Sequence, residues 1–186
     1  MNPSAFRRIY TPKLTNQLIA IGLLVCVVAG CKQLSKLGNP TVLKSPDGKF
    51  QLTVPAGCRD NPKLNEQAQI RAANLLAEVY VIVITDSKTD FTDEMDLDEF
   101  TRITRERFTS KVKEGEATEP VPVTINGNSG RAYELEGAVK GVKVAYRIAT
   151  VETANHYHQI ITWTLKSLKN ENRATLQQII DSFRST

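Results

Sequence analysis

Residues 78–85 read EVYVIVIT, and the fold class of the chain follows from this run. Apolar side chains occupy both alternating sets of positions in it: Val79, Val81 and Val83 on one side, and Tyr80, Ile82 and Ile84 on the other. A β-strand that is apolar on both sides is buried on both sides. We therefore predict a sheet at the centre of the domain, with a further layer packed against each face.

Shorter strands precede this run. Residues 41–44 and 50–54 are separated by residues 45–49, SPDGK. Proline presets the backbone of a turn and glycine tolerates a positive φ, so this spacing predicts a β-hairpin. The chain is then expected to leave the sheet over a polar stretch that ends near Asn65, and to return as a strand at residues 69–76.

A helix is expected from Asp96 onward. Asp96 is placed to act as the N-cap, with Glu99 three residues later as in a capping box. Acidic residues crowd the first turn and basic residues the later ones, which suits the helix dipole. We expect this helix to end near Lys113, before Gly115. Leu97, Phe100, Thr104 and Phe108 keep helical spacing in this segment, with Ile103 beside them.

The rest of the chain predicts an antiparallel meander and a closing helix. The four expected strands cover residues 121–125, 131–136, 142–151 and 156–165. Pro120 and Pro122 cannot donate to a strand ladder, so the first of these strands is expected at an edge. The closing helix carries one apolar stripe, made of Leu176, Ile179, Ile180 and Phe183. Residues 41–186 should thus form a single α+β domain, an antiparallel β-sheet flanked by helices.

Five segments of this domain carry a resemblance to a known family. They are residues 50–57 (FQLTVPAG), 79–85 (VYVIVIT), 123–127 (VTING), 159–164 (QIITWT) and 180–183 (IDSF). The chain resembles the PsbP/Mog1/DcrB-like superfamily, in its branch of small bacterial lipoproteins of unassigned function. The resemblance implies an α/β/α sandwich and extrinsic, scaffold-like roles, photosystem accessory proteins among them. Such similarity implies the fold better than the function.

One position departs from that superfamily. After its Pro-x-Gly motif the superfamily commonly has tryptophan, whereas this chain has Cys58. We interpret Cys58 as a small buried apolar residue. The alternative is a reactive thiol, which would need a pKa lowered by nearby cationic groups such as Arg59.

The first 30 residues have the form of a signal peptide. Residues 1–17 carry three basic residues and no acidic one, and residues 18–30, LIAIGLLVCVVAG, carry no charge. This apolar run is shorter than the roughly 20 residues that a membrane-spanning helix needs. We therefore predict that residues 1–30 are removed on export.

The end of this leader predicts lipidation. Val28, Ala29, Gly30 and Cys31 resemble the lipobox of bacterial lipoproteins, in which leucine is more frequent at the place of Val28. Cys31 would carry acyl chains that hold the protein on the cell membrane or outer membrane, facing the periplasm or the exterior. Residues 31–40 would be the lipidated cysteine and a tether with a reach of about 15 to 18 Å. The alternative is an ordinary secretory leader that contains a cysteine.

The charge balance argues against a nucleic-acid partner. Three of the 24 Lys and Arg residues, and none of the 20 Asp and Glu residues, lie in the first 30 positions, which leaves 21 against 20. A nearly neutral domain lacks the basic stripe that nucleic-acid binding requires. Cys58 also has no intrachain disulfide partner once Cys31 carries lipid.

The candidate reactive residues do not assemble into a site in the sequence. His156 and His158 share one face of a strand, but a metal site needs three or four ligands. The chain lacks Gly-x-Ser-x-Gly, and both of its histidines lie together late in the sequence. We expect no metal, no cofactor and no enzymatic activity. Trp163 is expected in the core beneath a helix rather than on a ligand-binding surface.

The functional hypothesis is a non-enzymatic, membrane-anchored binding or assembly module with a protein partner in the cell envelope. The alternative is a carrier of a small ligand or lipid, with a cavity between the sheet and a helix. A photosystem accessory protein is the third hypothesis, and no residue indicates a photosynthetic host.

Overall fold

The strand formed by the EVYVIVIT run lies in the middle of the sheet, as predicted. The structure is a computed structural model that describes residues 38–91 and 95–185. Strand β5 (Val79–Ser87) pairs with β4 (Ile70–Asn74) on one side and with β10 (His156–Leu165) on the other, both antiparallel. Within the described residues the sheet has eight strands, in the order β3-β4-β5-β10-β9-β8-β6, with β7 also paired to β8.

The predicted meander is confirmed, with one strand more than expected. Its remaining strands are β7 (Val121–Ile125), β8 (Asn128–Val139) and β9 (Val142–Glu152). Strand β7 pairs only with β8, so the two prolines lie at or beside an edge strand. The additional strand, β6 (Lys113–Ala117), also pairs with β8, and β3 (Arg59–Asp60) pairs with β4.

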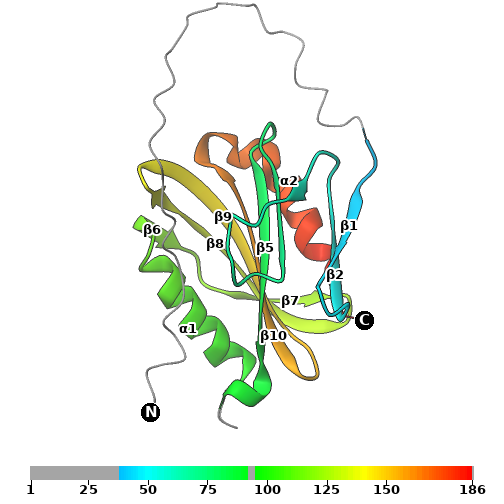
Figure 1. Ribbon diagram of the computed structural model, residues 1–186. Helices are drawn as coiled ribbons and strands as arrows, with labels where there is room; N and C mark the ends of the chain where they lie inside the picture. Colours follow the sequence, from blue (N-terminus) through cyan, green and yellow to red (C-terminus); the bar gives the residue numbers. More distant parts are fainter. Residues whose placement is uncertain (1–37, 92–94, 186) are drawn as a thin grey trace, which may run out of the picture.

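The predicted hairpin forms, but it belongs to a separate sheet. Strands β1 (Thr41–Lys44) and β2 (Phe50–Val54) are antiparallel, and β2 pairs on its other side with β11 (Arg184–Ser185). This small sheet brings the two ends of the domain together. It packs beside helix α2 (Lys169–Asp181) on one side of the large sheet (Figure 1).

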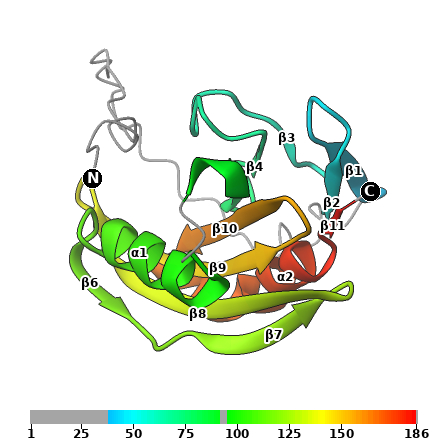
Figure 2. The same cartoon turned by 90° about the horizontal axis from the view of Figure 1, so that it is seen from below.

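The helices cover opposite faces of the large sheet. Helix α1 (Leu97–Thr109) and helix α2 (Lys169–Asp181) lie on opposite sides of it in both views (Figures 1 and 2). Short 3-10 helices, η3 (Lys88–Asp90) and η4 (Lys166–Leu168), follow β5 and precede α2. The α/β/α sandwich is therefore confirmed, and we name the two sides of the sheet the α1 face and the α2 face.

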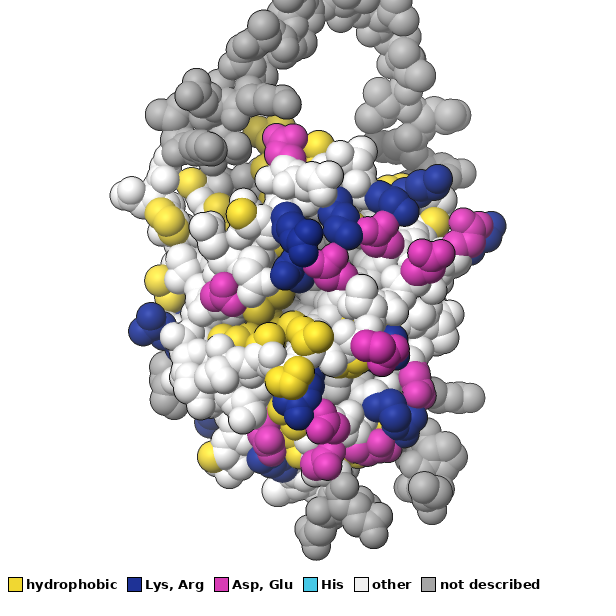
Figure 3. All heavy atoms as spheres, turned by 180° about the vertical axis from the view of Figure 1, so that it is seen from behind, with side chains coloured by type: hydrophobic (Ala, Val, Ile, Leu, Met, Phe, Trp, Pro, Cys, Tyr) yellow, Lys and Arg dark blue, Asp and Glu magenta, His cyan; other side chains and the backbone are white. Residues whose placement is uncertain are grey.

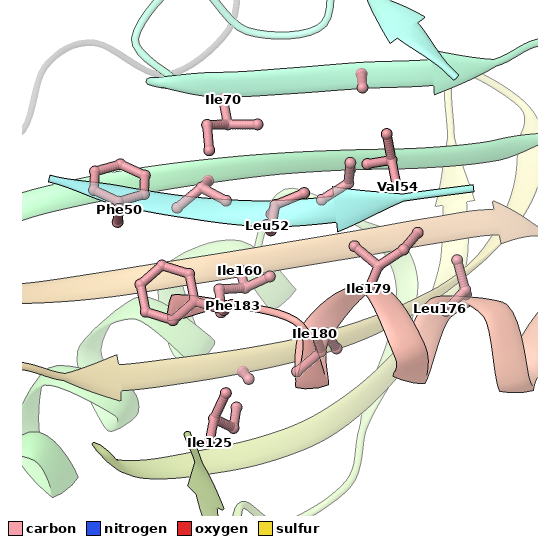
Figure 4. Close-up of a cluster of buried hydrophobic side chains, with 14 of the residues drawn as sticks. Phe50, Leu52, Val54, Ile70, Ile125, Ile160, Leu176, Ile179, Ile180 and Phe183 are labelled. Carbon is pink, nitrogen blue, oxygen red and sulfur yellow. The ribbon is translucent and has the colours of Figure 1, made fainter. Parts of the chain in front are cut away.

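The largest hydrophobic cluster lies on the α2 face. Alternate side chains of the sheet, among them Val81, Val83 and Ile160, meet the stripe of α2 and the inward side chains of β2 (Figure 4). Phe183 is fully buried here although it lies just after α2 rather than within it. Packed apolar side chains thus occupy the space between the sheet and α2.

Helix α1 begins as predicted and ends earlier than predicted. The Asp96 side chain accepts a hydrogen bond from the Glu99 backbone N–H at 2.8 Å, while the Glu99 carboxylate binds Arg102 instead of closing a capping box. The helix ends at Thr109, not near Lys113. After the helix, the Val112 side chain is buried against Gly137 of β8, where a Cβ would overlap with it. The chain turns at this point and continues as β6.

Candidate functional site

Helix α1 leaves one end of its sheet face uncovered. At this end the first residues of β5 lie next to the last residues of β10, which in turn lie next to the first residues of β9. Tyr80 is directly opposite Trp163, and Trp163 is directly opposite Tyr146, so the three side chains share one face. The Phe108 ring, near the C-terminal end of α1, meets the Tyr146 ring edge-on at 4.9 Å. Beyond this contact the aromatic side chains are only partly covered.

A recess of about 340 Å³ opens at this end of the sheet. We call it the aromatic recess, and it is lined by Glu78, Tyr80, Val142, Val144, Trp163, Thr164 and Leu165. All of these residues come from β5, β9, β10 and the turn before β5. Val142, at the rim, is 49% exposed, and Val144, deeper in the recess, is buried.

Stacked rings form the wall of the aromatic recess. The Tyr80 and Trp163 rings are parallel within 8°, with their centroids 5.2 Å apart. The Tyr80 hydroxyl donates a hydrogen bond to the Glu78 carboxylate at 2.7 Å. Burial is the main cause that raises the pKa of Tyr80 to about 12, and the hydrogen bond to Glu78 and the charge of Glu78 add to it. The recess therefore presents the stacked rings as an apolar surface, with the Tyr80 hydroxyl and the Glu78 carboxyl group hydrogen-bonded at its edge.

The position of Trp163 corrects our prediction. It was expected beneath a helix in the core, yet it is only partly buried and lines the recess. Trp163 packs at the edge of the hydrophobic cluster that lies between the sheet and α1. Sequence reasoning missed Tyr80 as its partner, because that contact depends on the register between β5 and β10. The sequence indicated only that the Tyr80 side chain lies on one face of its strand, and not which residue of another strand it would meet.

The two histidine rings lie 5.9 Å apart, and His158 is buried in the core. The His158 ring nitrogens lie within hydrogen-bonding distance of the Thr85 and Thr153 hydroxyls, at 3.0 and 3.1 Å. Its ring packs against the Phe50 and Phe183 rings, with centroids at 5.0 and 4.9 Å. Burial, assisted by His156, lowers the pKa of His158 to about 4. In the described part of the chain, no three His, Cys, Asp or Glu side chains gather closely enough to hold a metal ion.

Cys58 is buried in the large cluster on the α2 face. Burial raises the pKa of its thiol to about 11, which is the opposite of what a reactive thiol requires. The structure therefore supports the interpretation of Cys58 as a small apolar residue. Cys31 and the lipobox residues Val28, Ala29 and Gly30 lie outside the described residues.

Two carboxylates on the α2 face are paired with basic side chains. Glu134 and Glu136 of β8 contact a group of basic residues on β9, η4 and α2, namely Arg147, Lys166, Lys169 and Arg173. More widely, Lys and Arg side chains lie beside Asp and Glu side chains over the surface seen from behind (Figure 3). Among residues 38–91 and 95–185, no helix has both the length and the apolar character needed to cross a membrane.

Comparison with known proteins identifies the fold. The structure is similar to cyanobacterial PsbP (CyanoP) from Synechocystis sp. PCC 6803, with a TM-score of 0.61 at 11% identity over 88% of this chain and 99% of CyanoP. The chain has the PsbP/Mog1-like fold. LpqN of Mycobacterium tuberculosis, a protein involved in cell envelope biogenesis, shares this fold, with a TM-score of 0.58 at 14% identity over 80% of this chain and 91% of LpqN.

Mog1 also has the PsbP/Mog1-like fold, with a TM-score of 0.55 at 15% identity over 80% of this chain and 96% of Mog1. No family model and no curated protein sequence matches the chain. The predicted resemblance is therefore confirmed at the level of the PsbP/Mog1-like fold.

Proposed function

We propose that this chain is a lipid-anchored protein of the cell envelope that acts as a non-enzymatic binding or assembly module, with the aromatic recess as its docking site for a protein partner. The observation that carries this proposal is the Tyr80–Trp163 stack, which α1 leaves uncovered at the end of its sheet face.

The composition of the aromatic recess suits a protein interface. Tyrosine and tryptophan are enriched in interfaces and dominate their binding energy, because each buries a large rigid surface at little entropic cost. The exposed side chain of Val142 extends the apolar surface at the rim. The Glu78 carboxylate offers a hydrogen-bond acceptor that would set the orientation of a partner segment.

The packing favours an interaction module over a carrier. A carrier would need a ligand cavity between the sheet and a helix. On the α2 face, the apolar side chains of β2, the large sheet and α2 pack together in that space (Figure 4). The aromatic recess lies instead at the open end of the opposite face, where a partner can reach it from outside.

The chemistry of the titratable groups supports a non-enzymatic role. Cys58 is buried with a raised pKa, and His158 is held by two threonine hydroxyls. Neither group has the exposure that a nucleophile or a general base requires.

The location in the envelope rests on the leader sequence, with Cys31 as the lipidated residue. LpqN, a protein involved in cell envelope biogenesis, has the same fold, which is compatible with this location. The likeness to CyanoP at 11% identity extends to the fold alone, so it does not favour a photosystem partner over another membrane complex.

Photo-crosslinking in intact cells tests the proposal. A benzophenone amino acid replaces Val142 at the rim of the recess, and in a matched control it replaces Val121 of β7, which is 55% exposed. We expect one protein adduct from position 142, absent from position 121 and lost in the Cys31→Ala chain. Equal adducts at both positions, or none at position 142, would contradict the recess as a docking site.

A further inference from the structure

The turn between β4 and β5 exposes two adjacent leucines. Leu75 is 65% exposed and Leu76 is 97% exposed, whereas the preceding Asn74 is buried. An isolated exposed leucine is ordinary, but two in succession at the tip of a hairpin form a compact apolar projection. We call residues 75–77 the leucine tip.

The leucine tip is held in a defined shape. The Asn74 Oδ1 atom accepts hydrogen bonds from the backbone N–H groups of Leu76 and Ala77, at 3.2 and 3.0 Å. Glu78, the last residue before β5, has a positive φ of 53°. Both leucines are thus presented by a turn that a buried side chain organises.

Asn74 also connects the leucine tip to the start of the described chain. Its amide Nδ2 donates to the Ala56 carbonyl at 3.1 Å. A Cβ built on Gly38, the first described residue, would lie 2.9 Å from the Cβ of Ala56. The chain therefore enters the domain beside the leucine tip, and Figure 1 shows the β4–β5 turn and the start of β1 at the same end of the molecule.

The distance to the predicted anchor is short. Cys31 precedes Gly38 by seven residues, which span at most about 25 Å when fully extended. An acylated Cys31 would hold this end of the domain against the membrane surface. At the end of the sheet where β5 begins, Lys140 of the β8–β9 turn and Lys143 at the start of β9 are exposed, and their charge suits anionic headgroups.

We propose that the leucine tip inserts into the lipid bilayer beside the acyl anchor. This inference rests on the lipid anchorage proposed above. Leucine side chains leave water for the acyl layer, while the buried Asn74 keeps the turn intact. The tip and the anchor would together give the domain two points of attachment, which fixes its orientation and places the aromatic recess near the membrane.

Photolabelling from within the bilayer tests this inference. The acylated mature protein, residues 31–186, is recovered from host membranes and reconstituted into vesicles of phosphatidylethanolamine and phosphatidylglycerol. These vesicles contain a trace of a phospholipid with a diazirine in its acyl chain, and mass spectrometry maps the adducts. We expect several-fold more adduct on the peptide that contains Leu75 and Leu76 than on the one that contains Val121. The Leu75→Ser, Leu76→Ser double variant should lose this excess.

Flotation of the same samples separates the two proposals. Protein that floats with the vesicles but shows equal labelling of both peptides would overturn insertion of the tip and leave the anchorage standing. Protein that carries no acyl group and does not float would overturn the anchorage and the insertion with it. A tip that remains unlabelled in vesicles but crosslinks to a protein in native membranes would assign the leucines to a protein partner.

Discussion

The indole ring of Trp163 lies parallel to the phenol ring of Tyr80, with their centroids 5.2 Å apart, at the end of the sheet that α1 does not cover. The pair is produced by the antiparallel register of β5 and β10, in which these two residues are direct partners. It is part of the wall of the aromatic recess, so its integrity should affect both stability and partner binding.

The stack should have a measurable coupling energy. In a double-mutant cycle of Tyr80→Leu and Trp163→Leu, urea unfolding should give a coupling of about 0.5 to 1.5 kcal/mol, because aromatic pairs contribute that much beyond their buried area. Trp163→Leu should also reduce the adduct formed from position 142 in cells. If the two substitutions change the free energy of unfolding additively, the stack contributes nothing beyond the burial of each ring.

The burial of His158 predicts a dependence of stability on pH. Its pKa is lowered from 6.5 to about 4, so the unfolded chain binds the proton more tightly. Its contribution to stability is present above pH 6.5 and is lost as pH falls from 6.5 toward 4. The free energy of unfolding should therefore fall by up to about 1.4 kcal/mol per pH unit in this window from this group.

The His158→Gln variant isolates that contribution. It should be less stable at pH 7 and should show a shallower decline of stability between pH 6.5 and 4, measured by urea unfolding at several pH values. His156→Gln serves as the control that retains the buried ring. Parallel pH profiles for His158→Gln and the unmodified chain would rule out His158 as the source of the decline.

Cys58 should act through packing. Cys58→Ser places a hydroxyl in an apolar cluster and should cost about 1 to 3 kcal/mol of unfolding free energy. Cys58→Ala should cost less than that because it remains apolar. In the folded protein the thiol should react slowly with a disulfide reagent at pH 8, as its pKa is raised to about 11. Rapid reaction together with unchanged stability in Cys58→Ser would indicate a functional thiol.

A buried pair of threonines attaches α1 to the sheet. The Thr101 and Thr150 hydroxyls are hydrogen-bonded at 2.6 Å, and both residues are almost fully buried. Thr101→Val should destabilise the domain by about 1 to 3 kcal/mol, because it leaves the Thr150 hydroxyl poorly paired. Replacing both threonines by valine should recover much of that loss. Thermal unfolding of the two single variants and the double variant measures this directly.

The lipidation site is testable independently of the domain. Cys31→Ala should abolish metabolic labelling with a fatty acid and release the protein from membranes, since the acyl chains would have no attachment point. Cys58→Ala is the matched control and should remain labelled. Fatty-acid labelling that persists in the Cys31→Ala chain would show that the leader is not a lipoprotein signal.

The order and type of most elements could be predicted because their signals are local. The double-sided run at residues 78–85, the Asp96 cap and the Pro-Asp-Gly turn each depend on residues a few positions apart. Each of these predicted elements is present in the structure. The early end of α1 was missed because Val112 turns the chain by packing against Gly137, a residue on another strand.

By itself the sequence determined the alternation of buried and exposed positions, the caps and turns, and with them an α/β/α domain. Only the tertiary structure decided that β1 and β2 form a separate sheet, that Trp163 meets Tyr80, and that Gly38 lies beside the turn that carries Leu75 and Leu76. The physical reason is the separation along the chain of the residues that interact. Helix caps and turns are set by neighbouring residues, whereas the recess and the leucine tip depend on strand register and packing between segments that are distant in the chain.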